Sequence, residues 1–296
     1  AGWFDFLGGG NSNKVTIGYL PSDHDSALFV ADQQGLYKEK GIETELVQFN
    51  NGGDLMTAMA SGDIDIGYAG ITPVMSSISQ GVPVKVVSGA QIEGSSIVAN
   101  KNSGINTVAD LKGKTVATPG EATIQNMLLT SALTDAGVST SDVEFTTMKA
   151  AQMTDALKAG QVDAMIIWEP YASIAVKNGD GKLVETSGEI IPGHPCCCVV
   201  AREDFINNHP EELKKVLAAH ENATAFTNEN PAEAAKCLPE DIVPDQELQA
   251  GVIKDTTFIS GLDSTYKQNV MDFMNLEVKL GVLEKPLTES QIFADL

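Results

Sequence analysis

The stretch SGDIDIG at residues 61–67 has a counterpart further along the chain, AGQVDAM at residues 159–165. Each begins with a small residue and a glycine, and each continues into an apolar segment that one aspartate interrupts. A turn glycine followed by such a segment is typical of a strand that enters a core. The recurrence indicates that the chain contains the same structural unit twice.

The segments before each copy extend this match. In the first copy, the pattern predicts strands at residues 15–20 and 42–49, with a helix between them and a second helix after Gly53. In the second copy, it predicts strands at residues 115–118 and 143–145, again separated and followed by helices. Strands linked through helices form parallel sheets, and the loops at the carboxyl ends of the strands gather at one edge. We therefore predict an α/β protein with two lobes, each a mostly parallel sheet flanked by helices, and a ligand cleft between them.

The sequence also predicts how the chain is divided between the lobes. After Arg202, helices separated by prolines replace the strand pattern, and we expect this tail to join the first lobe. Lobe I then comprises residues 14–100 and 200–296, and lobe II comprises residues 101–199. Residues 1–13 are rich in glycine and are expected to form a flexible tether. Because the chain crosses between the lobes twice, near residues 100 and 199, we expect a hinge there.

The composition limits the partners that the protein can have. Forty acidic and 19 basic residues among 296 leave a formal net charge of −21. This charge would repel nucleic acid and an anionic bilayer, so we exclude nucleic acid as a partner. The longest apolar runs, such as residues 164–168, are far shorter than the roughly 20 residues of a membrane-spanning helix. We expect a globular protein with a sizeable core.

Six short motifs occur in a characteristic order along the first 171 residues. They are IGY at 17–19, GLYKEKGI at 35–42, ASGDIDIG at 60–67, VADLKGK at 108–114, GQVDA at 160–164 and WEPY at 168–171. Their order and spacing resemble those of the type II solute-binding proteins of ABC importers, in the branch that handles nitrate, sulfonates, taurine, bicarbonate and thiamine-pyrimidine precursors.

The resemblance implies a type II periplasmic-binding-protein fold that closes on a small-molecule solute and delivers it to an ABC transporter permease in the membrane. It implies an extracytoplasmic location, in the periplasm or at the outer face of the cell membrane, and we expect a monomer. Such proteins are often anchored through a lipidated cysteine at the mature start. This chain starts with Ala1, Gly2 and Trp3, so we expect a processed amino terminus, and a lipid anchor stays a hypothesis.

In this fold, the loops that follow the strands carry the ligand contacts. The candidate ligand-binding residues of the first lobe are Ser22, Asp23, His24, Asn51, Gly52, Gly53, Gly70, Ile71, Thr72 and Gln91. Those of the second lobe are Gly120, Glu121, Ala122, Thr123, Lys149, Trp168 and Glu169, together with His194 before the return to lobe I.

Several of these candidates also have a purely structural interpretation. Residues 52–53 and 120–123 could present free backbone N–H groups of helix starts to an anion, or they could be turn glycines and a helix cap. Trp168 could wall the solute or fill the lobe core. His24 lies between two aspartates, but neighbouring side chains seldom converge, so we expect no metal site there. Asp23 or His24 is expected to bond the ligand instead, while one aspartate caps the following helix.

The charges near the predicted cleft bear on the solute. Arg202 is the only arginine, and Lys149 is the only lysine that the repeat places at a cleft-facing loop. Four carboxylates near the cleft would repel an anion: Asp23, Asp25, Glu121 and Glu169. A neutral or cationic solute, such as an aminopyrimidine stacked on Trp168, fits this inventory better than nitrate does.

Residues 194–198, HPCCC, form the most unusual stretch of the chain. They resemble the cysteine run of the thiamine-pyrimidine synthases, which share the two-lobed fold and in which the run is suspected of binding iron. Val199 and Val200 stand where that run has a further aromatic residue and a cysteine. Side chains alternate along a strand, so at most Cys196 and Cys198 could share one ligand. The alternative is a buried strand in which the cysteines act as small apolar residues.

Two other functions remain open beside solute binding. One is an enzyme, similar to the thiamine-pyrimidine synthases, that uses His194 with the cysteines at 196–198. The other is an extracytoplasmic sensor. The chain contains no nucleophile elbow, Walker pattern or Cys-x-x-Cys spacing. We therefore expect a binding protein rather than an enzyme, with no catalytic residue, no cofactor and no bound metal.

Overall fold

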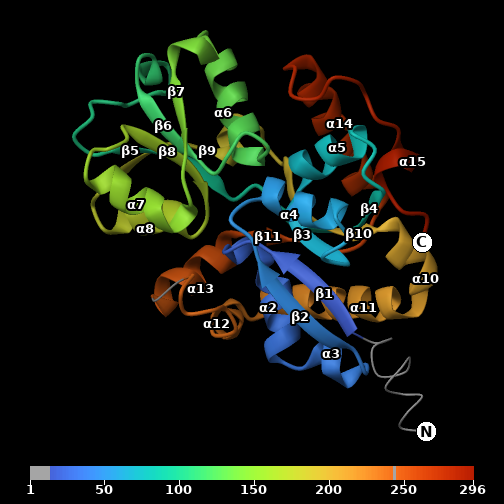
Figure 1. The fold of residues 1–296 in the computed structure, drawn as a ribbon. Coiled ribbons are helices and arrows are strands. Elements are labelled where there is room, and N and C mark those ends of the chain that lie inside the picture. Colours follow the sequence, from blue (N-terminus) through green and yellow to red (C-terminus); the bar gives the residue numbers. More distant parts are fainter. Residues whose placement is uncertain (1–13, 243–244) are drawn as a thin grey trace, which may run out of the picture.

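The computed structural model describes residues 14–242 and 245–296. Two β-sheets, each flanked by helices, form two lobes (Figure 1). This arrangement confirms the predicted α/β fold class. The tether expected at residues 1–13 lies outside the described residues.

The first sheet has six strands in the order β11-β4-β10-β3-β1-β2. Their bounds are Lys14–Tyr19 (β1), Glu43–Gln48 (β2), Ile66–Gly70 (β3), Val84–Ile92 (β4), Pro195–Arg202 (β10) and Thr257–Phe258 (β11). The second sheet has five strands in the order β7-β6-β8-β5-β9. Their bounds are Ser95–Asn100 (β5), Thr115–Thr118 (β6), Glu144–Thr147 (β7), Ala164–Trp168 (β8) and Gly181–Thr186 (β9).

The predicted duplication extends to single hydrogen bonds. Strand β1 lies between β2 and β3 and runs parallel to both, as β6 does between β7 and β8. The carboxylate of Asp65 accepts a hydrogen bond from the backbone N–H of Thr16 at 3.0 Å. In the second copy, the carboxylate of Asp163 accepts the equivalent bond from Thr115 at 2.9 Å. The aspartate that the two motifs share thus ties the third strand of each copy to its first strand.

Helices connect the parallel strands as predicted. Their bounds are Ser26–Gln33 (α2), Leu36–Glu39 (α3), Gly52–Ala60 (α4), Ile71–Ser79 (α5), Ile124–Asp135 (α6), Ala150–Lys158 (α7), Tyr171–Lys177 (α8) and Ser187–Ile190 (α9). Gly62 and Gly160 follow the ends of α4 and α7 with φ angles of 82° and 73°. Only glycine adopts this left-handed conformation without strain, so the two motif glycines end the helices that precede β3 and β8.

Each sheet also receives a strand from the other half of the chain. Strand β5 follows β4 after two residues, yet it pairs antiparallel with β8 and β9 in the second sheet. Strand β10 returns to the first sheet and lies antiparallel between β3 and β4. The crossings therefore lie at residues 93–94 and 191–194, earlier than the boundaries expected after residues 100 and 199. Apolar β5 and β10 show no break in composition, so only their pairing partners reveal where the chain crosses.

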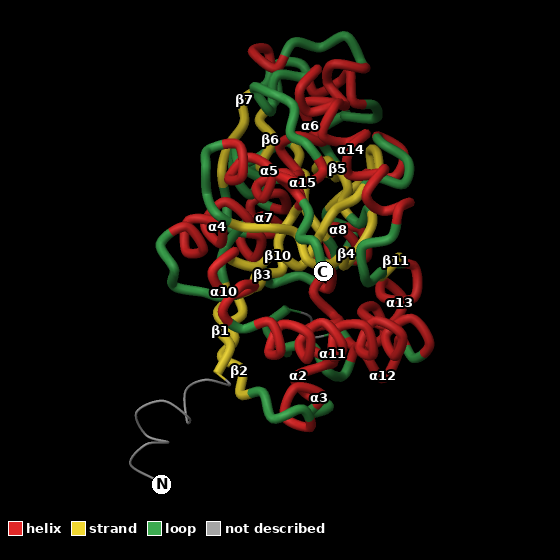
Figure 2. Tube along the Cα trace, turned by 90° about the vertical axis from the view of Figure 1, so that its right-hand side faces the viewer, coloured by secondary structure: helices red, strands yellow, loops and turns green. Residues whose placement is uncertain are grey.

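The C-terminal tail is helical, as expected, and packs on the first lobe. Its helices are Glu203–Asn208 (α10), Pro210–Glu229 (α11), Pro231–Ala235 (α12), Gln246–Asp255 (α13), Ser264–Lys279 (α14) and Glu289–Ile292 (α15). Helix α11 packs against α2 and α3, and α12 lies beside α2, so these four helices form one layer (Figure 2). Within the described residues, no helix is both long enough and apolar enough to cross a bilayer.

One buried carboxyl group in this tail generates a prediction about pH. Glu277 of α14 is 1% exposed, and burial raises its pKa to about 8. Because this folded-state pKa is above the unfolded value, ionisation favours unfolding, and stability is lost as the pH rises from about 4.5 to about 8. The loss is at most about 1.4 kcal/mol per pH unit. Glu277→Gln should remove this part of the pH dependence, as urea unfolding at pH 5 and pH 8 would measure.

Exposed Glu284 supplies the matched control, because it follows the same helix but stands in solvent. Glu284→Gln should leave the difference in unfolding free energy between pH 5 and pH 8 as it is in the wild type. An unchanged difference in Glu277→Gln would show that the buried carboxyl group does not titrate as stated.

Candidate ligand-binding cleft

A small cavity of about 20 Å³ lies between the two lobes. Its lining from lobe I is Leu20, Ser22, His24, Asp25, Gly52, Gly70, Pro73, Cys196 and Cys197. Lobe II supplies Thr123, Ile124, Gln125 and Trp168. Such a volume holds about one water molecule, so the lobes are closed on each other.

Hydrogen bonds join the lobes around this cavity. The indole N–H of Trp168 donates to the carbonyl of Pro21 at 3.0 Å, and the Ser22 hydroxyl donates to the carbonyl of Glu169 at 3.0 Å. The side-chain amide of Asn51 donates to the carbonyl of Pro119 at 3.1 Å. Loops that the sequence predicted to face each other are therefore in direct contact.

Gly94, at the first crossing, connects the lobes through its carbonyl oxygen. This oxygen accepts hydrogen bonds from His24 Nε2 at 2.8 Å and from the backbone N–H of Glu169 at 3.0 Å. The φ angle of Gly94 is 94°, and a Cβ atom there would collide with His24 Nε2 and Gln91 Nε2. Only glycine therefore fits at this position.

Four helices of at least eight residues begin at the cavity. Asp25 is the N-cap of α2, Gly52 is the first residue of α4, Gly70 is the N-cap of α5 and Thr123 is the N-cap of α6. Side-chain caps fix where two of these helices begin. Asn51 Oδ1 accepts a hydrogen bond from the N–H of residue 54 in α4, and Thr123 Oγ1 accepts one from the N–H of residue 126 in α6. The amino-terminal ends of helix dipoles favour an anion, and four of them meet at this cavity.

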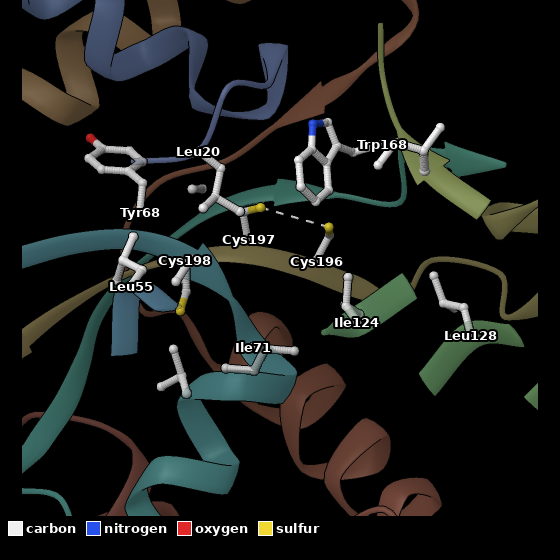
Figure 3. Packing of buried hydrophobic residues seen from close by; sticks show 14 of the residues in the cluster. Leu20, Leu55, Tyr68, Ile71, Ile124, Leu128, Trp168, Cys196, Cys197 and Cys198 are labelled. Carbon is white, nitrogen blue, oxygen red and sulfur yellow. Dashed lines mark hydrogen bonds between the residues drawn. The ribbon is translucent and has the colours of Figure 1, made fainter. Parts of the chain in front are cut away.

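Trp168 belongs both to the hydrophobic core and to the wall of the cavity (Figure 3). It ends β8 with 2% of its surface exposed. Its bond to Pro21 orients the ring across the boundary between the lobes.

The side chains of residues 23–25 point to three different partners, so they do not converge. Asp23 accepts a bond from Gln249 of α13 at 3.2 Å, Asp25 accepts from the N–H of Leu20 at 2.9 Å, and His24 bonds Gly94. The expectation that an aspartate caps the following helix is wrong, because Asp25 stands at the N-cap position of α2 but its side chain makes no capping bond. Burial raises the pKa of Asp23 to about 7 and that of Asp25 to about 8. Near neutral pH, Asp25 is therefore largely uncharged and Asp23 is about half charged, so the two groups repel an anion less than the sequence suggested.

The cysteine run departs from the prediction. Cys196 Sγ and Cys197 Sγ lie 3.8 Å apart, and each is 3.7 Å from His24 Nδ1. Figure 3 shows these two sulfurs pointing toward each other, while the sulfur of Cys198 points away. The expected pairing of Cys196 with Cys198 is wrong, because the register of β10 on β4 shifts on both sides of Cys197. Such a β-bulge interrupts the alternation of side chains along a strand.

These three groups also shift one another's pKa values. The hydrogen bond from Cys197 and the adjacent His24 hold the pKa of the Cys196 thiol well below its usual range. Burial is the largest single effect and lowers the pKa of His24, but the charge of Cys196, the hydrogen bonds to Cys196 and Gly94 and the charge of Asp23 together raise the net pKa to about 9. Both shifts favour the charged forms of the pair, an imidazolium at His24 and a thiolate at Cys196.

The structure divides the predicted ligand-binding residues into three groups. Those that line the cavity are Ser22, His24, Gly52, Gly70, Thr123 and Trp168. Those that border it at the contact between the lobes are Asp23, Asn51, Gly53, Gly120, Ala122 and Glu169. Those that do neither are Ile71, Thr72, Gln91, Glu121, Lys149 and His194.

The residues of the last group have other positions. Thr72 lies beside Glu277, Gln91 donates to nearby carbonyl groups, and Lys149 is an exposed N-cap of α7. His194 stacks on the ring of Phe273, with 5.8 Å between the ring centroids.

The cavity lining also contains residues outside the predicted ligand-binding set, although the sequence already indicates Asp25 as a charge near the cleft and the two cysteines as part of the cysteine run. The residues outside the predicted set are Leu20, Asp25, Pro73, Ile124, Gln125, Cys196 and Cys197. Most of them stand one to three residues from a predicted residue, so wider windows around the strand ends would have found them. Among the residues that the structure describes, no lysine or arginine lines the cavity. Arg202 forms ion pairs with Asp65 and Asp204 at the far end of β10.

Comparisons with known proteins agree with this architecture. The chain belongs to the NMT1-like family, whose model matches residues 8–238. It is 30% identical over 262 residues to the taurine-binding periplasmic protein of Escherichia coli K12, a match that covers 85% of this chain and 80% of the relative. It is 23% identical over 242 residues to the 4-amino-5-hydroxymethyl-2-methylpyrimidine phosphate synthase of Schizosaccharomyces pombe, over 76% of this chain and 69% of the relative.

The fold is also similar to that of a solved structure. The alkanesulfonate-binding protein SsuA from Xanthomonas axonopodis pv. citri, bound to MOPS, superposes with a TM-score of 0.84 at 21% sequence identity. The match covers 95% of this chain and 98% of that protein. The type II periplasmic-binding-protein fold expected from the sequence is thereby confirmed.

The crowding at Gly94 leads to a prediction about stability. Gly94→Ala should destabilise the protein both through its positive φ angle and through the collision with His24 and Gln91. Gly104 has a φ angle of 75°, but no atom lies within 4 Å of the place that a Cβ atom would take there. Gly104→Ala therefore measures the backbone effect alone, about 1 kcal/mol. Gly94→Ala should cost about 1–3 kcal/mol more, as chemical denaturation would measure. Equal losses in the two variants would contradict the tight packing at Gly94.

Proposed function

We propose that this protein is the solute-binding component of an ABC importer, located in the periplasm or at the outer face of the cell membrane. It captures a small sulfonate of the taurine class between its lobes and delivers it to a permease. The observation that carries this proposal is the convergence of four helix N-termini on one cavity between the lobes. The similarity to a taurine-binding periplasmic protein supports the same conclusion.

The electrostatics of the cleft favour a sulfonate over the aminopyrimidine that the sequence suggested. Backbone N–H groups can hold an oxyanion without a basic side chain. The raised pKa values of Asp23 and Asp25 reduce the repulsion that counted against an anion. These carboxyl groups could also accept a hydrogen bond from the ammonium group of taurine.

The geometry gives less support to an enzyme of the thiamine-pyrimidine-synthase kind. That alternative would use His194 together with the cysteine run. His194 does not line the cavity, and its Nδ1 atom lies 2.8 Å from the carbonyl of Pro195.

Binding of a sulfonate should depend on the cap of α6. Isothermal titration calorimetry with taurine and ethanesulfonate should show one site per chain. Thr123→Val removes the hydroxyl that caps α6, and it should weaken binding about tenfold, or about 1.4 kcal/mol. Thr130→Val is the matched control, because Thr130 is in the same helix and its hydroxyl donates only to the carbonyl of Asn126. Binding of the aminopyrimidine in place of both sulfonates, or equal affinities in the two variants, would contradict the proposal.

Solute entry should require the lobes to separate, because the cavity is smaller than any sulfonate. A Cβ atom built at Gly53 lies 3.1 Å from Ala122 Cβ across the cleft, slightly less than the roughly 3.5–4.5 Å of a disulfide. The double variant Gly53→Cys with Ala122→Cys should therefore form a disulfide that locks the lobes together. Calorimetry should detect no taurine binding to the oxidised double variant and normal binding after reduction.

The two single variants, treated with the same oxidant, control for effects of the substitutions themselves. If the oxidised double variant bound taurine as the reduced form does, entry by separation of the lobes would be refuted.

A further inference from the structure

Three potential metal ligands meet in the wall of the cleft. They are His24 Nδ1, Cys196 Sγ and Cys197 Sγ, and these atoms all lie within 4.8 Å of one another. All three side chains are buried, and all three residues line the cavity. His24 comes from the turn after β1 and the cysteines come from β10, so the tertiary structure alone brings them together.

A hydrogen bond on the side of the ring opposite the sulfurs fixes the orientation of His24. Its Nε2 atom lies 2.8 Å from the carbonyl oxygen of Gly94. A carbonyl oxygen only accepts hydrogen bonds, so Nε2 carries a proton and Nδ1 is the nitrogen that faces the two sulfurs. Metal-binding histidines are commonly held by such a bond from the other ring nitrogen.

The distances among the three atoms match a tetrahedral metal site. An ion bound at about 2.3 Å from sulfur and about 2.05 Å from nitrogen separates two sulfurs by about 3.8 Å, and a sulfur from a nitrogen by about 3.6 Å. The observed separations are 3.8 Å between the sulfurs and 3.7 Å from each sulfur to Nδ1. An ion could therefore be bound with almost no movement of the side chains.

We propose that His24, Cys196 and Cys197 bind a thiophilic d¹⁰ metal ion, Zn²⁺, in the wall of the cleft. Two thiolates and one imidazole suit Zn²⁺, whereas Mg²⁺ and Ca²⁺ prefer oxygen ligands. Three protein ligands leave the fourth position open, as in zinc sites that take an exchangeable ligand and unlike closed structural sites.

The open coordination position would bind the anionic group of the solute. It faces the cavity where α4, α5 and α6 begin, so an anionic group on the ion would also meet the N–H groups of these helices. This second part of the inference rests on the proposed function. The metal site itself does not.

Co²⁺ provides a direct test of the site, because cobalt occupies zinc sites and its bonds to thiolates absorb in the near ultraviolet. Full-length protein, kept reduced by a non-thiol reductant, should bind one Co²⁺ with this absorption, and Zn²⁺ should displace it. Cys196→Ser and Cys197→Ser should each weaken binding about 100-fold or more. Cys198→Ala is the matched control, because Cys198 is equally buried on the same strand but points away, and its affinity should equal that of the wild type.

Thermal unfolding distinguishes the loss of a metal-binding side chain from the loss of the folded structure. Without metal, the serine variants should have circular dichroism spectra like that of the wild type. Zn²⁺ should raise the Tm of the wild type and of Cys198→Ala, but not that of Cys197→Ser. The site would be refuted if wild-type protein with Co²⁺ showed no thiolate absorption. It would also be refuted if Cys198→Ala lost this absorption as the two serine variants do.

Taurine binding with and without a chelator then distinguishes the two proposals. If Zn²⁺ binds but no sulfonate does, the metal site stands and the proposed solute class is refuted. If taurine binds equally well to chelated protein and to Cys197→Ser, the solute-binding function stands and the role of the open position is refuted.

Discussion

The carbonyl oxygen of Gly94 accepts a hydrogen bond from each lobe, and the geometry of the cleft depends on this junction. From lobe I it fixes the His24 ring, and from lobe II it holds the backbone of Glu169, next to Trp168. The junction exists because β4 continues into β5 across the boundary between the lobes after only two residues. A side chain at this position would displace His24, so the crossing, the histidine and the tryptophan wall form one unit.

The exchange of strands explains why the cleft carries chemistry that neither repeat contains. Strands β1 to β3 and β6 to β8 are built alike, down to the bonds of Asp65 and Asp163. Strand β10 corresponds to β5, because each enters the opposite sheet antiparallel and lies beside the third strand of that copy, but only β10 carries cysteines. Its irregular register brings Cys196 and Cys197 to the same side of the strand. The pseudo-symmetric scaffold thus supplies the helix N-termini, and the exchanged strand supplies the sulfur atoms.

Burial changes the electrostatic character of the cleft. If both were ionised, Asp23 and Asp25 would repel an anion from the cleft. Desolvation raises both pKa values toward or above neutrality, because a carboxylate without water around it is costly. The helix N-termini then act on the cavity together with His24 and Cys196, and they help a chain with a net charge of −21 to present a site suited to an oxyanion.

The sequence by itself determined the repeated strand and helix order, the α/β class and the loops that meet in the cleft. Periodicity and turn glycines such as Gly62 and Gly160 are local properties, and local interactions suffice to form those elements. Only the tertiary structure decided where the chain crosses between the lobes, which cysteines share a face and which carboxyl groups lose their charge. Strand pairing, a bulge in β10 and desolvation each depend on residues far away in the chain, so no window of sequence contains them.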